Sequence, residues 1–302
     1  MEGIKTAQPR SGRPQKITIR DERHILRAVM DNRRQHLAEL NANVVPHASR
    51  STLKRVLKKH NIKKWTAAER PLLDDKIATL RLEWALRYKD WDAEDWKKVV
   101  WSDECSVEKS ADPRQVWVFR TPGEKWLKAC ISGKMKSGQC SLMVWGCFAG
   151  ELKGTFTSIR GGITAEVYQS VLEENLPQFV EEVNETLGEE PIFMQDNAPV
   201  HTAHLVRNWL HGEDYLVMKW PPYSPDINPI EHIWRKLKIL LQIYHPEIKH
   251  HSGRPEVVKD ALAKALPAMW DRLEEKDFWE LSSSMPARVR ALIKANGWYT
   301  KY

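Results

Sequence analysis

The stretches PIFMQDNAPVH (residues 191–201) and WPPYSPDINPIEHIW (residues 220–234) decide the fold class of this 302-residue chain. The first has the pattern of a short apolar strand that is followed by a carboxylate, Asp196. The second has the pattern of a proline-stiffened loop that leads into a helix bearing Glu231, and 34 residues separate the two acids. An earlier segment, KKVVWSDE (residues 97–104), also predicts a strand that ends in a carboxylate, Asp103. Strands that alternate with helices in this way indicate an α/β layered sheet.

Asp103, Asp196 and Glu231 together predict a site for hard divalent cations. Mg²⁺ takes oxygen ligands in near-octahedral geometry and leaves positions open for water and phosphate. Two such ions roughly 3.5–4 Å apart can polarise both the attacking and the leaving oxygen of a phosphodiester. Three acids in the order strand, strand, helix therefore favour metal-dependent phosphodiester chemistry.

Each of the three acids also has a purely structural explanation. Asp103 suits a turn after a strand, and Asp196 suits the start of a turn and the cap of the next helix. Glu231 suits the third position of a helix that begins at Asn228 and Pro229, where a carboxylate stabilises the first turn. None of these roles explains why such acids recur in one order, so metal binding is the stronger interpretation.

Polar neighbours of the acids are candidates for supporting roles. Asn197 and His201 follow Asp196 closely and could orient a metal ligand or a water molecule, although His201 could equally well begin a helix. Glu104 could be a spare ligand, but the next position along a strand faces the opposite side. By the same alternation Trp101 should share the side of Asp103.

Composition excludes several classes of protein. Hydrophobic residues make up 42% and charged residues 29% of the chain, which is typical of a globular protein. No run approaches the roughly 20 apolar residues of a membrane span, and the N-terminal residues lack a secretory hydrophobic region. The four cysteines show no metal-type spacing and are expected to be reduced core residues. We therefore expect an intracellular protein without a membrane partner.

Positive charge is concentrated at the start of the chain. Residues 1–70 hold 17 Lys and Arg against 6 Asp and Glu, a net charge of +11, whereas the other 232 residues hold 30 against 34. A small basic module joined to a mildly acidic one suggests a polyanion as the partner of the first part. A solvated basic surface is the alternative.

Three short helices are predicted in this basic region, at Thr18–Met30, Gln35–Asn41 and Ser49–Lys59. Their number and spacing favour a helix-turn-helix unit whose third helix enters the major groove of DNA, although three helices could also pack without any DNA role. On that helix, the residues expected near base edges are Ser49, Arg50, Ser51 and Lys54, and those expected near phosphates are Arg55, Lys58 and Lys59. Arg10 and Arg13 lie in an extended stretch that could enter an A·T-rich minor groove.

The pattern of elements predicts how the chain divides. Residues 1–16 form a basic minor-groove linker, 17–68 the helix-turn-helix domain, 69–95 an interdomain linker helix, and 96–302 the catalytic domain. In the linker helix, at Asp74–Tyr88, we expect an apolar face formed by Ile77, Leu80, Leu82, Trp84 and Leu86. The catalytic part is predicted to contain strands at Val99–Ser102, Gln115–Arg120, Ser141–Phe148, Gly154–Ile159, Ile192–Gln195 and Tyr215–Lys219, with helices near Thr164–Leu187 and His204–His211.

The motifs WSDE (residues 101–104), QDNAPVH (195–201) and WPPYSPDINPIEHIW (220–234) resemble those of the mariner superfamily of transposases, specifically its Tc branch. That branch has an Asp-Asp-Glu triad with the same 34-residue gap. The resemblance runs from about Arg10 to Tyr302. It implies an RNase H-like catalytic domain behind a helix-turn-helix domain, with Asp103, Asp196 and Glu231 as catalytic acids that bind two Mg²⁺ or Mn²⁺ ions.

The resemblance also implies a function. A Tc-type transposase cuts the terminal inverted repeats of its element and joins the freed 3′-hydroxyl to a TA target, in the nucleus and as a homodimer on double-stranded DNA. In this family a peptide such as residues 9–16 links two helix-turn-helix units, and the chain starts just before it, so we expect the first unit to be missing, as in a truncated copy. The alternatives are a transposon-derived, sequence-specific DNA-binding protein without catalytic activity, and an RNase H-type nuclease with other substrates.

Overall fold

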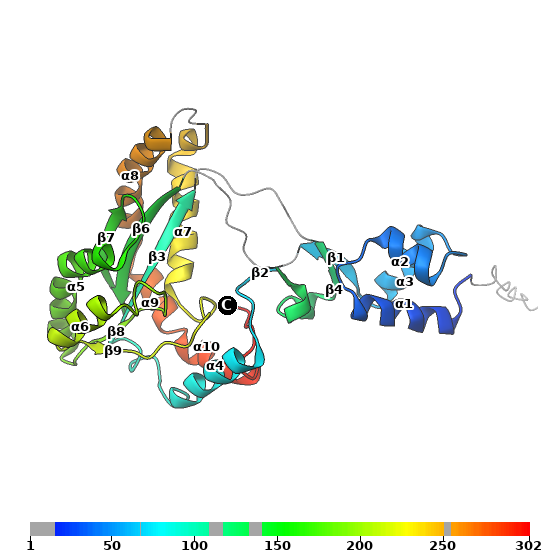
Figure 1. Cartoon of the computed structure of the whole chain (residues 1–302), viewed down its shortest axis with the longest axis horizontal. Helices are drawn as coiled ribbons and strands as arrows, with labels where there is room; N and C mark the ends of the chain where they lie inside the picture. Colours follow the sequence, from blue (N-terminus) through cyan, green and yellow to red (C-terminus); the bar gives the residue numbers. More distant parts are fainter. Residues whose placement is uncertain (1–15, 67, 109–116, 133–140, 251–254) are drawn as a thin grey trace, which may run out of the picture. The chain divides into compact units, whose positions relative to one another are not determined.

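The computed structural model describes residues 16–66, 68–108, 117–132, 141–250 and 255–302 (Figure 1). Arg10 and Arg13 lie outside the described residues. The chain divides into two compact units. The first contains the described parts of residues 1–70 and 114–133, and the second contains those of 71–113 and 134–302. The units therefore differ from the sequence-based boundaries in two places: the predicted linker helix belongs to the second unit, and a segment after residue 113 belongs to the first.

Three helices form the core of the first unit: α1 (Ile19–Asp31), α2 (Leu37–Val44) and α3 (Arg50–Lys59). Thr18 and Ser49 cap α1 and α3, because their side-chain oxygens accept hydrogen bonds from the backbone N–H of Asp21 and Thr52. The buried side chains between the helices are Ile25, Val29, Leu40, Leu53, Val56 and Leu57. The prediction of three helices is confirmed, and Met30 near the end of α1 is 45% exposed.

Short strands complete the first unit. β1 (Lys63–Thr66) pairs antiparallel with β4 (Trp117–Arg120), and β2 (Ala68–Glu69) pairs in parallel with β5 (Ile131–Ser132). Two 3₁₀ turns, η1 (Pro122–Glu124) and η2 (Lys128–Cys130), lie between β4 and β5. Phe119 of β4 packs into the helical core, and the Arg33 guanidinium binds the Glu124 carboxylate at 2.8 Å. These contacts explain why residues 117–132 pack with the helices rather than with the large sheet.

A mixed five-stranded sheet forms the centre of the second unit. Its order is β7-β6-β3-β8-β9, with β3 antiparallel to β6 and parallel to β8. The strands are β3 (Val99–Glu108), β6 (Ser141–Ala149), β7 (Leu152–Ile159), β8 (Ile192–Met194) and β9 (Leu216–Val217). β3 is longer than predicted. Asp103 therefore lies inside this strand and not at its end, which corrects the sequence-based expectation.

Helices cover both faces of the sheet (Figure 1). On one face lie α5 (Ala165–Leu187) and α6 (His204–Gly212), and on the other lie α7 (Ile230–Tyr244), α8 (Pro255–Asp271) and α9 (Glu275–Ser282). Successive residues of β3 alternate between these layers. Val100 packs under α5 and α6, whereas Trp101 and Cys105 pack under α7. Asp103 shares the α7 side with Trp101, as we predicted.

The remaining helices, α4 (Asp75–Arg87) and α10 (Met285–Lys294), pack against each other in the second unit. A 3₁₀ turn, η3 (Pro246–His250), follows α7. The buried residues of α4 are Ala78, Arg81, Trp84 and Ala85. Of the apolar face that we predicted for this helix, Leu80 and Leu86 are 41% and 47% exposed. The prediction of its packing face was therefore wrong for these two leucines and right for Trp84, which is buried. Within the described residues, no helix is long and apolar enough to span a bilayer.

Candidate active site

The central strand β3 carries Asp103 between two neighbours. On one side Asp103 is paired with Gly146 of β6. On the other side Trp101 is paired with Met194, the last residue of β8. Asp103 and Asp196 each follow this pair by two residues, so they come to equivalent positions. Adjacent strands lie about 4.8 Å apart. The register therefore brings Asp103 and Asp196 to the same end of the two central strands.

Glu231 lies in the first turn of α7, which packs against β3. Trp234, one turn further along, is buried and contacts the sheet next to Asp103. A Cβ atom built on Gly146 would lie 3.0 Å from the indole of Trp234 and 3.2 Å from that of Trp270. The glycine opposite Asp103 is thus required for the close approach of α7. The helix begins at Ile230, after Pro229, and the Asn228 side chain accepts a hydrogen bond from the Ile230 N–H, so the helix start falls one residue later than predicted.

Negative charge converges on Asp103. Burial raises the pKa of the Asp103 carboxyl well above its ordinary value, and the neighbouring charges of Glu231, Glu104 and Asp196 raise it further. Repulsion of this kind among neighbouring carboxylates is relieved by a cation. Among the described side chains, no group of three or more His, Cys, Asp or Glu has the geometry of a formed metal site. The donor set is nevertheless the oxygen-only set that Mg²⁺ and Mn²⁺ prefer, so the residues fit such ions chemically.

His201 is the main polar neighbour of Asp196. Its Nδ1 lies 2.7 Å from Oδ1 of Asp196, and its Nε2 lies 3.2 Å from Oε2 of Glu104. Burial of the imidazole opposes protonation, but the contacts with Asp196 and Glu104 outweigh it and raise the pKa of His201 to about 10. The reverse holds for Asp196. Its partial burial favours the neutral form and raises the pKa. The hydrogen bond and the charge of His201 outweigh this effect, so the pKa of the Asp196 carboxyl is lowered.

Tyr168 supports this arrangement from α5. Its ring lies 4.1 Å from that of His201, centroid to centroid, and its hydroxyl donates to Oε1 of Gln195 at 2.8 Å. Glu104 therefore contacts His201 on the α5 side of the sheet, as its position in the strand predicts. The side-chain amide of Asn197 donates to the Trp220 carbonyl at 2.7 Å. This hydrogen bond ties the segment after β8 to the loop that precedes α7.

A cavity of about 510 Å³ lies along the α7 face that carries Glu231, and its lining includes Trp234, Arg235 and Lys238. Two cationic side chains beside the carboxylate of Glu231 suit a phosphate backbone. Another cavity, of about 620 Å³, lies against β7, α5 and the α8–α9 turn and contains none of the three acids.

The predicted DNA-contacting residues of α3 lie on its exposed side. These residues are Ser49, Arg50, Ser51, Lys54, Arg55, Lys58 and Lys59. Three of them already have intramolecular partners. One is Arg55, whose Nη2 donates to the Thr52 hydroxyl at 3.5 Å. Ser49 caps the helix, and the Lys59 ammonium binds Glu22 of α1 at 2.8 Å. The basic side chains Arg50, Lys54, Arg55, Lys58 and Lys59 are all exposed, which is the arrangement expected of a recognition helix.

Sequence reasoning missed a buried ionic cluster in the second unit. Arg81 of α4 is fully buried and binds Asp226, which lies in the loop that precedes α7. The one signal for it in the sequence was the Asp within the YSPD stretch (residues 223–226), since an acid in a proline-rich loop needs a partner when it is buried.

A mixed sheet with one acid on its central strand, a second just after the adjacent parallel strand and a third on the helix packed against them is typical of an RNase H-like domain. Family comparisons agree. Residues 98–249 match the family described as DDE superfamily endonuclease, and residues 22–90 match a transposase family of the Tc3 helix-turn-helix type.

Similar proteins extend this result over nearly the whole chain. The Tcb1 transposase of Caenorhabditis briggsae is 30% identical over 285 residues, which cover 93% of this chain and 100% of that protein. The Tc1 transposase of Caenorhabditis elegans is 28% identical with the same coverage. Among solved structures, a Mos1 transposase paired-end complex with the left transposon end has a TM-score of 0.67 at 16% sequence identity, covering 98% of this chain and 83% of that chain. The catalytic domain of Mos1 mariner transposase has a TM-score of 0.50 at 18% identity, covering 77% of this chain and 99% of that chain.

The chain belongs to the Tc1/mariner family of DDE-type transposases, which move DNA by cut-and-paste transposition. The predicted family, fold class and function are confirmed. DNA is the partner that the helix-turn-helix region implies.

Proposed function

We propose that this chain cuts DNA at the ends of a transposable element and joins the freed 3′ ends to target DNA, with Asp103, Asp196 and Glu231 as its catalytic acids. The observation that carries the proposal is the position of Asp103: it is partly buried, it is paired with β6 beside the end of β8, and the carboxylates of Glu231, Glu104 and Asp196 surround it. Two Mg²⁺ or Mn²⁺ ions would be held by these three side chains. Similar solved structures include Mos1 paired-end complexes with Mn and with Mg, which supports the use of divalent ions here.

The chemistry divides between the ions and the protein. When bound, two divalent ions polarise the attacking and leaving oxygens of a phosphodiester. The protein orients its ligands: His201 fixes one oxygen of Asp196, the sheet fixes Asp103, and the first turn of α7 presents Glu231. A carboxylate with a protonated partner stays ionised, which keeps Asp196 ready to bind a cation.

Two phosphoryl transfers follow from this arrangement. In the first, water attacks phosphorus at the transposon end, the bond to the 3′ oxygen breaks, and a free 3′-hydroxyl and a 5′-phosphate remain. In the second, this 3′-hydroxyl attacks a phosphodiester of target DNA at a TA dinucleotide, and one phosphodiester bond replaces another. No covalent bond to the protein forms in either step.

DNA binding would use both units. The side chains proposed near base edges are Ser49, Arg50, Ser51 and Lys54, and those proposed to meet phosphates are Arg55, Lys58 and Lys59. Arg10 and Arg13 are proposed to enter the minor groove. Because an element has two ends, a homodimer would supply one active site for each end. We place this activity in the nucleus.

Cleavage of a supercoiled plasmid that carries the element's inverted repeats, each bordered by TA, tests the proposal. With Mg²⁺ we expect the wild-type chain to nick and linearise this plasmid, and chelation should stop it. Asp103→Asn, Asp196→Asn and Glu231→Gln should each lower the rate on the order of 10³-fold or more. Asp260→Asn is the control, since Asp260 is 52% exposed in a surface pair with Arg160.

Equal cutting by the wild-type chain and the three acid variants would remove the assignment. Salt-sensitive binding to the repeats without any nicking would identify a DNA-binding protein that lacks catalytic activity. Cutting that does not depend on the repeats would identify a nuclease with other substrates.

A further inference from the structure

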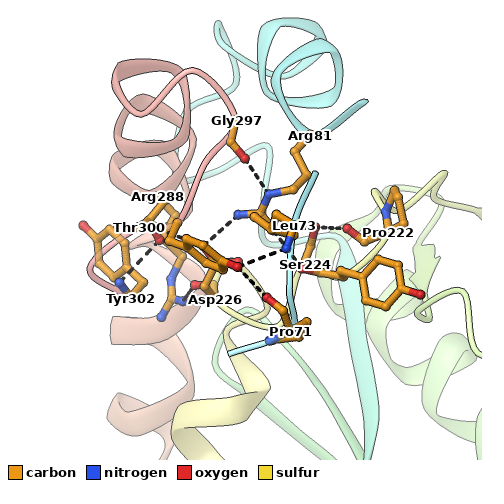
Figure 2. Close-up of polar contacts among 12 residues, drawn as sticks. Pro71, Leu73, Arg81, Pro222, Ser224, Asp226, Arg288, Gly297, Thr300 and Tyr302 are labelled. Carbon is orange, nitrogen blue, oxygen red and sulfur yellow. Dashed lines mark hydrogen bonds and ion pairs between the residues drawn. The ribbon is translucent and has the colours of Figure 1, made fainter. Parts of the chain in front are cut away.

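The buried guanidinium of Arg81 binds the loop that leads to α7 at several points (Figure 2). Its Nη2 donates to Oδ2 of Asp226 at 2.8 Å, and its Nη1 donates to the Ser224 hydroxyl at 2.7 Å and to the Tyr223 carbonyl at 3.1 Å. The Nε of the same side chain donates to the Gly297 carbonyl at 2.8 Å. One planar group thus joins three parts of the fold that are far apart in sequence: α4, the loop of residues 220–229, and the segment after α10.

Asp226 completes the cluster from the loop side. Its Oδ2 also accepts hydrogen bonds from the Thr300 backbone N–H at 3.1 Å and from the Thr300 hydroxyl at 3.0 Å. The Asp226 carbonyl accepts from Nη1 of Arg288 at 3.2 Å. The Asp226 residue is only 4% exposed, so its position is fixed by these donors and not by solvent. Gly297 is equally constrained, since its φ is +80° and an added Cβ would lie 1.8 Å from the Ala78 carbonyl oxygen.

The loop has little freedom between this cluster and the catalytic helix. Asp226 precedes Glu231 by five residues, and Ile227, Asn228 and Ile230 between them are almost completely buried. Pro225 and Pro229 restrict the backbone further. A displacement of Asp226 would therefore be passed to the first turn of α7.

The other end of the loop is held by the same helix. Trp84, one turn after Arg81 on α4, packs edge-on against Trp220 at 4.9 Å between ring centroids, and Trp220 packs against Trp101 at 5.9 Å. Trp101 precedes Asp103 by two positions in β3. The Trp220 carbonyl also accepts the hydrogen bond of Asn197, the residue after Asp196. Asp103 is therefore linked to this loop through Trp101, Asp196 through Asn197, and Glu231 directly along the chain.

We propose that Arg81 is a positioning residue for the active site: through Asp226 it fixes the loop that sets Glu231 relative to Asp103 and Asp196. This inference rests on the proposed function. A buried ion pair is weak evidence for stability, since apolar side chains of similar volume often serve as well, and its directional hydrogen bonds instead specify one geometry. Mg²⁺ demands near-ideal octahedral ligands, so a small shift of Glu231 would weaken its binding.

Binding of Mn²⁺, followed by its electron paramagnetic resonance signal, tests the proposal independently of cleavage. The variants are Arg81→Lys, which keeps the charge but loses the planar fork, and Thr300→Val, which removes one hydroxyl donor to Asp226. We expect Arg81→Lys to bind Mn²⁺ on the order of 10-fold more weakly, the scale seen when a supporting hydrogen bond of a metal site is lost, and Thr300→Val to shift in the same direction by less. The matched control is Arg160→Lys, whose 2.8 Å partner Asp260 lies on the surface.

Three further readouts separate positioning from general stability. Thermal melting and binding to the repeats should match the wild-type chain within error for Thr300→Val. For Arg81→Lys, cleavage should fall more in Mg²⁺ than in Mn²⁺, because Mn²⁺ is less strict about ligand geometry.

Each outcome decides the question. Folded variants with wild-type Mn²⁺ affinity and a wild-type ratio of Mg²⁺ to Mn²⁺ rates would overturn the proposal. The proposal would also be overturned if the Arg81→Lys chain failed to fold and the Thr300→Val chain bound Mn²⁺ normally, because the cluster would then be structural only. A wild-type chain that binds no Mn²⁺ would instead count against the proposed function itself.

Discussion

The helices α3 and α4 both carry arginine among aliphatic residues, yet they use it in opposite ways. In α3 the side chains of Arg50 and Arg55 are exposed, and the leucine and valine side chains form the buried face. In α4 the buried face is centred on Arg81, and Leu80 and Leu86 are exposed. The apolar pattern of a helix therefore predicts its packing when its partners are apolar neighbours close in sequence. It fails when the partner is a distant carboxylate.

Removing the buried charge of α4 should have the largest effect. We expect Arg81→Met to destabilise the second unit by about 3–5 kcal/mol, because Asp226 would be left buried without its cation. Urea unfolding followed by tryptophan fluorescence measures this loss. The double variant Arg81→Met/Asp226→Asn should recover part of it, and a double variant that is less stable than the single one would contradict the explanation.

A half-buried pair in the first unit should give an intermediate effect that depends on pH. The hydrogen bond from Arg33, with further donors at Thr121, lowers the pKa of Glu124 from 4.5 to about 2. Since the folded state holds the carboxylate ionised, its contribution to stability is present above about pH 4.5 and is lost as the pH falls toward 2. After a discount for the 21% exposure of Glu124, we expect a change of about 2 kcal/mol.

Pulse proteolysis in urea between pH 2.5 and 6, with fragments assigned to each unit by mass, measures this dependence. Glu124→Gln should flatten the pH profile of the first unit and leave that of the second unchanged. An unaltered profile in the Gln variant would show that other carboxylates dominate.

Exposed charges of α3 should have the smallest effect on stability and a clear effect on DNA. Arg50→Ala and Lys54→Ala should change the free energy of unfolding by no more than about 0.5 kcal/mol. Each should weaken binding to the inverted repeats by about 1–3 kcal/mol if it contacts a base edge, and Lys58→Ala should reduce the salt dependence by about one phosphate contact. Fluorescence anisotropy over a salt series, with the exposed Lys264→Ala of α8 as control, distinguishes these outcomes. Unchanged affinity in all three would mean that α3 does not contact DNA.

Much of the fold was predictable because its signals are local. Thr18, Ser49, Asp74 and Thr164 each accept a backbone hydrogen bond at the start of a helix, and the sequence placed all four helix starts there. The apolar strands of the sheet were also found, although β3 was predicted to stop at Ser102. It continues because residues 103–108 pair antiparallel with residues 141–146 of β6, which a strand pattern alone does not reveal.

The supporting residues of the site could not be predicted in the same way. Arg81 lies 145 residues from Asp226, and Glu104 meets His201 only because β3 and β8 are paired in parallel. We expected Asn197 to orient a metal ligand or a water molecule, and nothing in the sequence indicated that its side-chain amide would donate to the Trp220 carbonyl. The placement of residues 117–132 in the first unit depends likewise on long-range contacts, of which the pair Arg33–Glu124 is the clearest.

The central claim is that Asp103, Asp196 and Glu231 share divalent ions. Isothermal titration of the DNA-free chain with Mn²⁺ tests it most directly. We expect two bound ions in the wild-type chain, and weaker binding or a lost ion in Asp103→Asn, Asp196→Asn and Glu231→Gln, while Asp260→Asn behaves as wild type. Identical titrations for all five chains would contradict the claim.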